Sequence, residues 1–335
     1  MGIDLPLVWA VIILFAVMMY VIMDGFDLGI GLLFPFVPDR ADRDVMMNTI
    51  APVWDGNETW LVLGGAGLMA AFPLAYSVVL SALYLPIVVM LLGLIFRGVA
   101  FEFRFKASDR SRHWWDKAFA GGSLTATFCQ GVILGAYIDG LPVVGRAYAG
   151  GTFGWVSPFA AFVGVALVLA YALLGSTWLI LKTSGPLQAR ITRYARPLAW
   201  ALFAVICVVS LWTPLTHPAI AQRWFSLPNL FWFSPVPVLV AISVWRLHVV
   251  LRREAHAEPF LLTLCLVFLG YTGLGISVWP NVIPPSVTIW AAAGPPQSLG
   301  FTLVGALLVI PAILAYTAWG YFVFRGKVDA AAGYH

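Results

Sequence analysis

Long uninterrupted apolar stretches constrain the fold of this chain more than any other feature, and the run from Leu5 to Met23 is one of them. In hydrocarbon, a segment must satisfy its own backbone N–H and C=O groups, so stretches of roughly 20 apolar residues cross a membrane as helices. A membrane β-barrel would alternate apolar with polar residues over about 10 residues. Only 10% of the residues are charged, against about 25% in soluble domains. A water-soluble fold is therefore excluded, and the sequence predicts an all-α polytopic membrane protein.

Nine apolar segments are bounded by charges or by Pro and Gly clusters and are long enough to span a bilayer. They are expected at about 7–33, 51–73, 78–100, 117–137, 156–182, 196–214, 230–251, 259–279 and 299–324. The hydrophilic stretches between them are too short for a separate soluble domain. We therefore expect residues 1–335 to form a single membrane domain with nine transmembrane helices.

The lysines and arginines indicate how these helices are oriented, because cytoplasmic loops retain positive charge. Every Lys and Arg except Arg146 and Arg223 lies near the ends of the segments that face one side. This pattern predicts a periplasmic N-terminus and a cytoplasmic C-terminus, which an odd number of helices requires. The first segment has no basic region before it and carries Asp4 instead, so we expect it to remain as a helix and not to be a cleaved signal.

A weak internal similarity links two segments that each end a predicted helix on the outer side. CQGVILGAYIDGLPV begins at Cys129, and YTGLGISVWPNVIPP begins at Tyr271. Two four-helix bundles plus one extra helix would produce this similarity. Short Gly-rich matches also arise by chance in apolar sequence, so both explanations stay open.

Five carboxyl groups lie in or beside the predicted spans, where an ionisable group costs several kcal/mol unless it is paired or wetted, and four of them form two pairs. Asp24 and Asp27 occur in MDGFDLGIG, three residues apart and therefore on one helical face. Asp55 and Glu58 repeat this spacing in WDGNETW. The topology places both pairs at the cytoplasmic level of the membrane, so we expect them to lie close together.

A third motif, RGVAFEFR, reaches the same level and offers Arg97, Glu102 and Arg104 as counter-charges and supporting groups. A purely structural explanation also exists. Asp55 and Glu58 would lie in the first turn of a helix, where the macrodipole favours acids, and Glu102 would pair with one of the two arginines. This explanation is weaker for the first acidic pair, which lies toward a helix C-terminus.

The functional explanation is a proton pathway, because burial raises the pKa of a carboxyl group and allows it to exchange protons near neutral pH. The acids would then carry protons inward from the cytoplasm. A metal site is a weaker alternative, since no His stands near them and hard cations recruit more oxygen ligands. Trp54 and Trp60 flank the second acidic pair. They are expected to line the site or a subunit contact, or to belong to an interfacial aromatic belt.

Histidine is missing from the middle of the predicted spans. The histidines lie in loops, at the terminus or near a span end, at positions His113, His217, His248, His256 and His335. The cysteines fall in three different spans without CxxC spacing, at Cys129, Cys207 and Cys265. Because haem iron needs an axial His, Met or Cys, and the Met and Cys residues in spans are first of all packing residues, we expect this chain to ligate no haem. A disulfide or thiolate metal site is not expected either.

The motifs MDGFDLGIG, WDGNETWLVLGG and RGVAFEFR together resemble those of subunit II of cytochrome bd-type quinol oxidases. The resemblance covers the chain from end to end and is closest to the cyanide-insensitive branch. It implies a two-subunit respiratory enzyme of the bacterial inner membrane that oxidises quinol outside and reduces O2 to water with cytoplasmic protons. The partner, subunit I, would hold two b haems and one d haem. Some members also hold a structural quinone in subunit II or have a small accessory subunit.

The resemblance also assigns residues. The proton-pathway acids of the family correspond to Asp24 and Asp55, with Trp54 and Trp60 beside them. Glu58 is replaced by Gln in some members, so its role is less secure. Two other classes stay open at this point: a secondary transporter with a coupling-ion site at these acids, and a purely structural partner in which the acids only cap helices.

Overall fold

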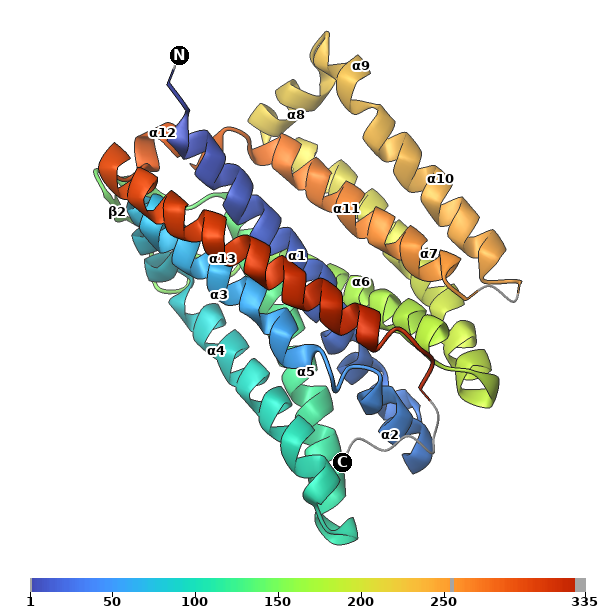
Figure 1. The fold of residues 1–335 in the computed structure, drawn as a ribbon. Helices are drawn as coiled ribbons and strands as arrows, with labels where there is room; N and C mark the ends of the chain where they lie inside the picture. Colours follow the sequence, from blue (N-terminus) through green and yellow to red (C-terminus); the bar gives the residue numbers. More distant parts are fainter. Residues whose placement is uncertain (1, 254–255, 329–335) are drawn as a thin grey trace.

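The computed structural model describes residues 2–253 and 256–328 and is built almost entirely of helices (Figure 1). The long helices are α1 (Leu5–Leu33), α3 (Trp54–Ala71), α4 (Pro73–Lys106), α5 (Asp109–Asp139), α6 (Pro158–Lys182), α7 (Gly185–Thr216), α10 (Pro235–Val250), α11 (Glu258–Val278) and α13 (Pro296–Val323). The shorter ones are η1 (Phe34–Phe36), α2 (Arg40–Asn48), α8 (Pro218–Phe225), α9 (Asn229–Phe233) and α12 (Ile289–Ala292). Two antiparallel hairpins pair β1 (Val143–Val144) with β2 (Ala147–Tyr148) and β3 (Asn281–Ile283) with β4 (Val287–Thr288).

Eight helical segments of the described residues are long and apolar enough to cross a membrane. The remaining predicted span, 51–73, forms α3, which has only 18 residues. Its first turns carry Asp55, Asn57 and Glu58, and these polar side chains separate it from the other eight. The mostly helical membrane fold is thus confirmed, whereas nine crossings and their orientation stay predictions.

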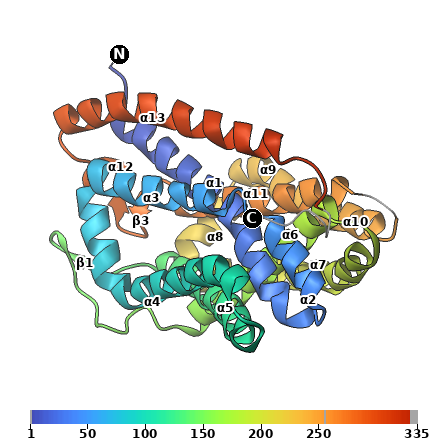
Figure 2. The same ribbon diagram turned by 60° about the horizontal axis from the view of Figure 1, so that its bottom comes forward.

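Helices α1 and α6 lie at the centre of the molecule, with α3, α4 and α5 on one side and α7, α10 and α11 on the other (Figure 1). Figure 2 shows α13 along one side, with α4 and α5 on the opposite side. The crossing of α1 and α6 is close because a glycine stands at it. A Cβ on Gly29 would lie 1.9 Å from the carbonyl oxygen of Tyr171, so MDGFDLGIG provides close packing as well as acids.

The two segments of the weak internal similarity meet in the structure. Each ends a helix, α5 or α11, and leads into one of the two hairpins. The backbone N–H of Leu141 donates to the carbonyl of Pro284 at 3.2 Å, and the Tyr137 hydroxyl donates to the carbonyl of Val282, also at 3.2 Å. Both segments therefore close the same end of the molecule, while the division into two four-helix bundles stays a prediction.

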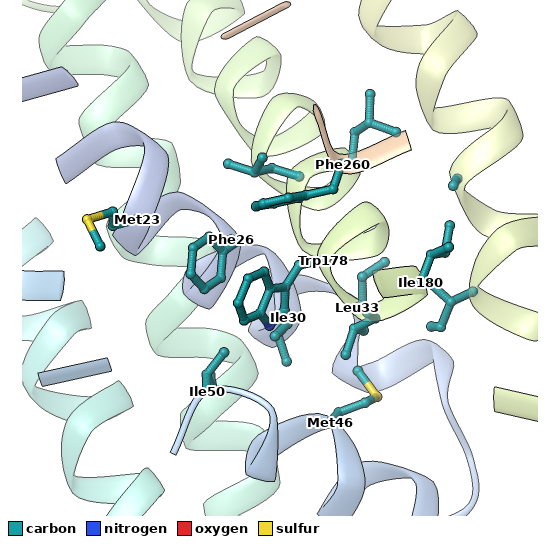
Figure 3. Packing of buried hydrophobic residues seen from close by; sticks show 14 of the residues in the cluster. Met23, Phe26, Ile30, Leu33, Met46, Ile50, Trp178, Ile180 and Phe260 are labelled. Carbon is teal, nitrogen blue, oxygen red and sulfur yellow. The ribbon is translucent and has the colours of Figure 1, made fainter. Parts of the chain in front are cut away.

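The apolar core that supports α1 is aromatic where three helices meet. Phe26 of α1 stacks on Trp178 of α6, with ring centroids 4.3 Å apart, and Trp178 also contacts Phe260 of α11 edge-on (Figure 3). Stacked and edge-to-face pairs of this kind add to the stabilisation from burial alone. Since Phe26 lies between the two aspartates of α1, this packing fixes the face that the aspartates present.

The connection between α1 and α3 is held by ion pairs to the α4–α5 hairpin. Arg104, which is fully buried, donates to Asp44 of α2 and to Asp116 of α5 at 2.5 Å. Arg43 of α2 also donates to Asp116, at 2.8 Å. Because α2 is attached in this way, the start of α3 has a fixed place beside α4.

Candidate functional site

A buried arginine joins two of the predicted acids. Arg97 of α4 is 2% exposed, and its Nη1 atom donates to Oδ1 of Asp24 at 2.7 Å, while its Nη2 atom donates to Oε1 of Glu58. These contacts bring the MDGFDLGIG, WDGNETW and RGVAFEFR motifs, which the predicted topology put at one level, side by side. Charge-assisted hydrogen bonds of this type are among the stronger polar contacts in proteins. One guanidinium thus holds carboxyl groups of two different helices at one place.

The second aspartate of α1 makes a separate set of contacts. Asn57 of α3 donates through Nδ2 to Oδ2 of Asp27 at 2.8 Å and to the carbonyl of Met23 at 3.3 Å. The hydroxyl of Tyr321, from α13, donates to Oδ1 of Asn57 at 2.9 Å. The amide of Asn57 therefore connects α13 to Asp27.

The cluster has more carboxyl groups than cations. Among the described residues, Arg97 is the one cation that is ion-paired with Asp24 and Glu58, and Asp27 has no ion pair. Asp24 and Asp27 are fully buried, and Oδ2 of Asp24 and Oδ1 of Asp27 have no hydrogen-bond partner in the described structure. Uncompensated buried charge is costly, so the number of protons in this cluster governs its energy.

Exposure decreases from Asp55 to Asp24. Asp55 lies in the first turn of α3 and is exposed, whereas the side chain of Glu58, one turn later, is 29% exposed and that of Asp24 is fully buried. Trp54 covers the cluster from the same turn, since the Arg97 guanidinium lies 5.9 Å from its ring centroid. The order of the acids therefore runs from the surface to the interior.

Capping explains little of this arrangement. The N-cap residue of α3 is Val53, and it makes no side-chain capping hydrogen bond. The carboxyl group of Glu58 contacts Arg97 of another helix. Asp55 lies in the first turn, where the helix dipole favours an acid, so the structural explanation still applies to that residue alone.

Three predicted supporting residues lie elsewhere. Glu102 is exposed and pairs with neither Arg97 nor Arg104 among the described contacts, so the expected pairing was wrong. Arg104 is ion-paired with Asp44 and Asp116 and not with the predicted acids. Trp60 is fully buried and contacts Phe15 of α1 edge-on, at 5.7 Å between ring centroids.

Sequence reasoning missed three polar residues of the site. Asn57 stands inside WDGNETW, where a buried amide in an apolar helix was an available signal. Tyr321 comes from the last long helix, and nothing in its local sequence indicates a contact with α3. Tyr20 lies one turn before Asp24 on α1, near the Asp24 carboxyl group, and its oxygen accepts from Nε2 of Gln130 at 2.7 Å.

The position of Tyr321 is fixed by hydrogen bonds from two lysines to backbone carbonyls at the end of α13. Nζ of Lys182, at the end of α6, donates to the carbonyls of Phe324 and Gly326, the latter at 2.8 Å. Nζ of Lys327 donates in return to the carbonyl of Thr183 at 2.9 Å. These reciprocal contacts hold the end of α13 against α6, one turn beyond Tyr321.

No group of three or more His, Cys, Asp or Glu side chains within residues 2–253 and 256–328 is arranged to hold a metal ion. The three cysteines are free thiols.

We predict that Tyr321→Phe lowers the thermal stability of the purified protein by about 1 kcal/mol, the net contribution of one hydrogen bond. The phenyl ring keeps its packing, but the buried Oδ1 of Asn57 loses its donor. Thermal unfolding followed by tryptophan fluorescence measures the change. Tyr316→Phe is the matched control, because Tyr316 is on the same helix, is 47% exposed and makes no hydrogen bond among the described residues. Equal effects of the two variants would contradict the prediction.

Comparison with known proteins agrees with the motifs. The family model described as cytochrome bd terminal oxidase subunit II matches residues 5–324. The cytochrome bd-I ubiquinol oxidase subunit 2 of Escherichia coli K12 is 29% identical, over 97% of this chain and 95% of that protein. The cytochrome bd ubiquinol oxidase subunit 2 of Bacillus subtilis 168 is also 29% identical, over 96% of each chain.

A solved structure agrees at the level of the fold. A chain of the bd oxidase from Geobacillus thermodenitrificans superposes with a TM-score of 0.74 at 18% identity, covering 96% of this chain and 99% of that one. The family match extends over nearly the whole sequence and includes all three motifs of the acid cluster. This chain therefore belongs to the cytochrome bd terminal oxidase subunit II family.

Proposed function

We propose that the chain is subunit II of a two-subunit respiratory quinol oxidase of the bacterial inner membrane, which reduces O2 to water. The family match over residues 5–324 carries this proposal, and two relatives are named as ubiquinol oxidase subunits. The chain acts as a scaffold for subunit I, which carries two b haems and one d haem. The proposed complex also includes a bound quinone and a small accessory subunit, as in those members of the family that have them. No contact among residues 2–253 and 256–328 favours the transporter alternative.

Nine membrane crossings in one membrane domain, with the N-terminus outside, fit this function best. Helix α3 runs beside α1 along the bundle (Figure 1), and the polar side chains of Asn57 and Glu58 in its first turns contact α1, α4 and α13. The end of the bundle that carries α2 holds the ion pairs of Arg40, Arg43 and Arg104. Positive charge is retained in the cytoplasm, so this end faces the cytoplasm.

The acid cluster supplies the cytoplasmic protons. Asp55 takes up a proton at the surface, Glu58 receives it one turn deeper, and Arg97 holds Glu58 and Asp24 on its two Nη atoms. The ring of Trp54 limits access of water to the Arg97 guanidinium. Two observations support this route. Side-chain exposure decreases from Asp55 through Glu58 to Asp24. In addition, the cluster holds one cation, Arg97, for its three buried or half-buried acids. Carboxyl groups in low dielectric near a membrane face are typical of proton relays.

Purification of the chain with an affinity tag tests the oxidase function. We expect a haem-bearing membrane partner to elute with it, and the eluate to consume O2 when quinol is added. Absorbance spectra of b and d haem identify the partner. A chain that elutes alone, without haem, and moves a solute across vesicles would instead establish the transporter alternative.

A further inference from the structure

A groove of about 300 Å³ lies between α4 and α5, away from the acid cluster's polar contacts. These helices form the long antiparallel hairpin drawn in teal in Figure 1. Gly93 and Gly122 bring the two backbones together, since a Cβ on Gly122 would lie 2.5 Å from the carbonyl oxygen of Gly93. Leu92 and Phe96 form the α4 wall and are 48% and 59% exposed. The groove therefore opens on the outside of this chain.

Two cations form a positive strip that continues the groove toward the α2 end of the bundle. Lys117 lines the groove itself. Arg110 lies seven residues before Lys117 on α5, so helical periodicity puts it on the same side of the helix. Both side chains are exposed, and neither is ion-paired among the described residues.

The nearby acids do not neutralise these cations. Asp109 is paired with Arg40, and Asp116 with Arg43 and Arg104. Glu102 is exposed on α4 one turn before Lys106, so these two opposite charges balance each other. Asp139 lies at the far end of α5. The strip therefore keeps a positive charge.

Aromatic side chains mark the height of the membrane interface along the same strip. Trp114 is 63% exposed, and Nζ of Lys117 lies 4.8 Å from its ring centroid. Phe103 of α4 is 56% exposed. Exposed Trp beside Lys or Arg is typical of the level of lipid headgroups. The apolar groove lies on the membrane side of the headgroup level, and the cations lie at that level. The two parts therefore match the apolar tail and the charged head of one lipid.

We propose that this groove binds one anionic phospholipid. An acyl chain packs against the two glycines, and the phosphate lies between Lys117 and Arg110. Free cations at the interface attract anionic headgroups, each with an effect of about fivefold in affinity. The apolar walls give no reason for a headgroup preference, so the cations alone set the preference for an anionic lipid.

The test uses the intact two-subunit complex, purified in detergent, delipidated and titrated with phosphatidylglycerol or phosphatidylcholine during native mass spectrometry. We expect one phosphatidylglycerol to bind about tenfold or more tighter than phosphatidylcholine, whose choline cation offsets the charge of its phosphate. Lys117→Gln should weaken phosphatidylglycerol about fivefold and phosphatidylcholine by less than that. Arg193→Gln is the charge control, because Arg193 is an exposed cation on α7. An equal loss in Arg193→Gln, or equal binding of the two lipids, would overturn the proposal.

A steric variant tests the groove independently of charge. Nothing lies within 4 Å of a Cβ built on Gly121 or on Gly270, so a side chain can start from either backbone position without a clash at its Cβ. Gly121→Leu fills the groove and should remove this binding of both lipids, whereas Gly270→Leu on α11 should change neither. Retained binding in Gly121→Leu would overturn the proposal, as would a complex in which subunit I covers the groove and no lipid binds. If Lys117→Gln fails to assemble, Lys117→Arg, which keeps the charge, and Gly121→Leu decide the question.

Discussion

Asp24→Asn should slow quinol-dependent O2 reduction by about a hundredfold, the low end of what a positioned proton-transfer group contributes. The asparagine oxygen can still accept from Nη1 of Arg97, which now lies 2.7 Å from Oδ1 of Asp24. The hydrogen-bond geometry is therefore preserved, while the negative charge of the carboxylate and its capacity to take up and release a proton are lost. O2 consumption by the purified complex measures the effect, and haem absorbance confirms that assembly is unchanged.

Two comparisons make this result specific to the buried cluster. Asp109→Asn makes the same chemical change at a carboxyl group whose side chain is 82% exposed, and turnover should be unaltered. Asp55→Asn should reduce turnover only severalfold, because solvent reaches this exposed position and can replace its carboxyl group. Unchanged turnover in both Asp24→Asn and Asp55→Asn would remove these acids from the mechanism, whereas loss of assembly would favour a packing role.

The helices could be predicted from apolarity, but their ends could not. The predicted span 196–214 is part of α7, which begins at Gly185, and the predicted 117–137 is part of α5, which begins at Asp109. In both cases the extra turns are polar and lie at the α2 end of the bundle. Hydropathy indicates which part of a helix lies in lipid. Backbone hydrogen bonding can continue the helix beyond that apolar part, so the helix ends cannot be predicted from hydropathy alone.

Periodicity also decides which predicted site contacts are right. Asp24 and Asp27 share a face, as their spacing of three residues requires. Glu102 follows Arg97 by five residues, which is about 140° around the helix, so it points away from the acids. Arg104 follows by seven residues and shares the Arg97 face, but it lies about 10 Å further along the axis, at the level of α2.

The contact of Tyr321 with Asn57 could not be predicted from one sequence. The two residues are 264 positions apart, and only the packing of α13 across α3 brings them together. A tyrosine in an apolar helix is equally compatible with the membrane interface or with a packed core. Local sequence therefore identifies the acids, whose charge is unusual in a membrane, and does not identify their neutral partners.

Arg97→Gln should have the largest effect on stability, lowering it by about 3–5 kcal/mol, the cost of breaking a buried ion pair by removing one partner. Arg97 is 2% exposed and contacts both Asp24 and Glu58. Its removal leaves three acids without a cation, and glutamine supplies one amide donor in place of the guanidinium. The measurement is the midpoint of thermal unfolding of the purified two-subunit complex, with the yield of assembled complex as a second readout.

A double variant separates the lost charge from lost packing. Adding Asp24→Asn to Arg97→Gln removes one of the unbalanced carboxylates, so the pair should recover about 1–3 kcal/mol relative to the sum of the single changes, as directly contacting residues do. Lost packing alone would leave the two effects additive. Arg193→Gln, an exposed arginine on α7, should stay within about 0.5 kcal/mol of the parent. If Arg97→Gln were as stable as Arg193→Gln, the acids would have to be neutral without the arginine. The ion pairs of Arg97 would then not be what holds α1, α3 and α4 together.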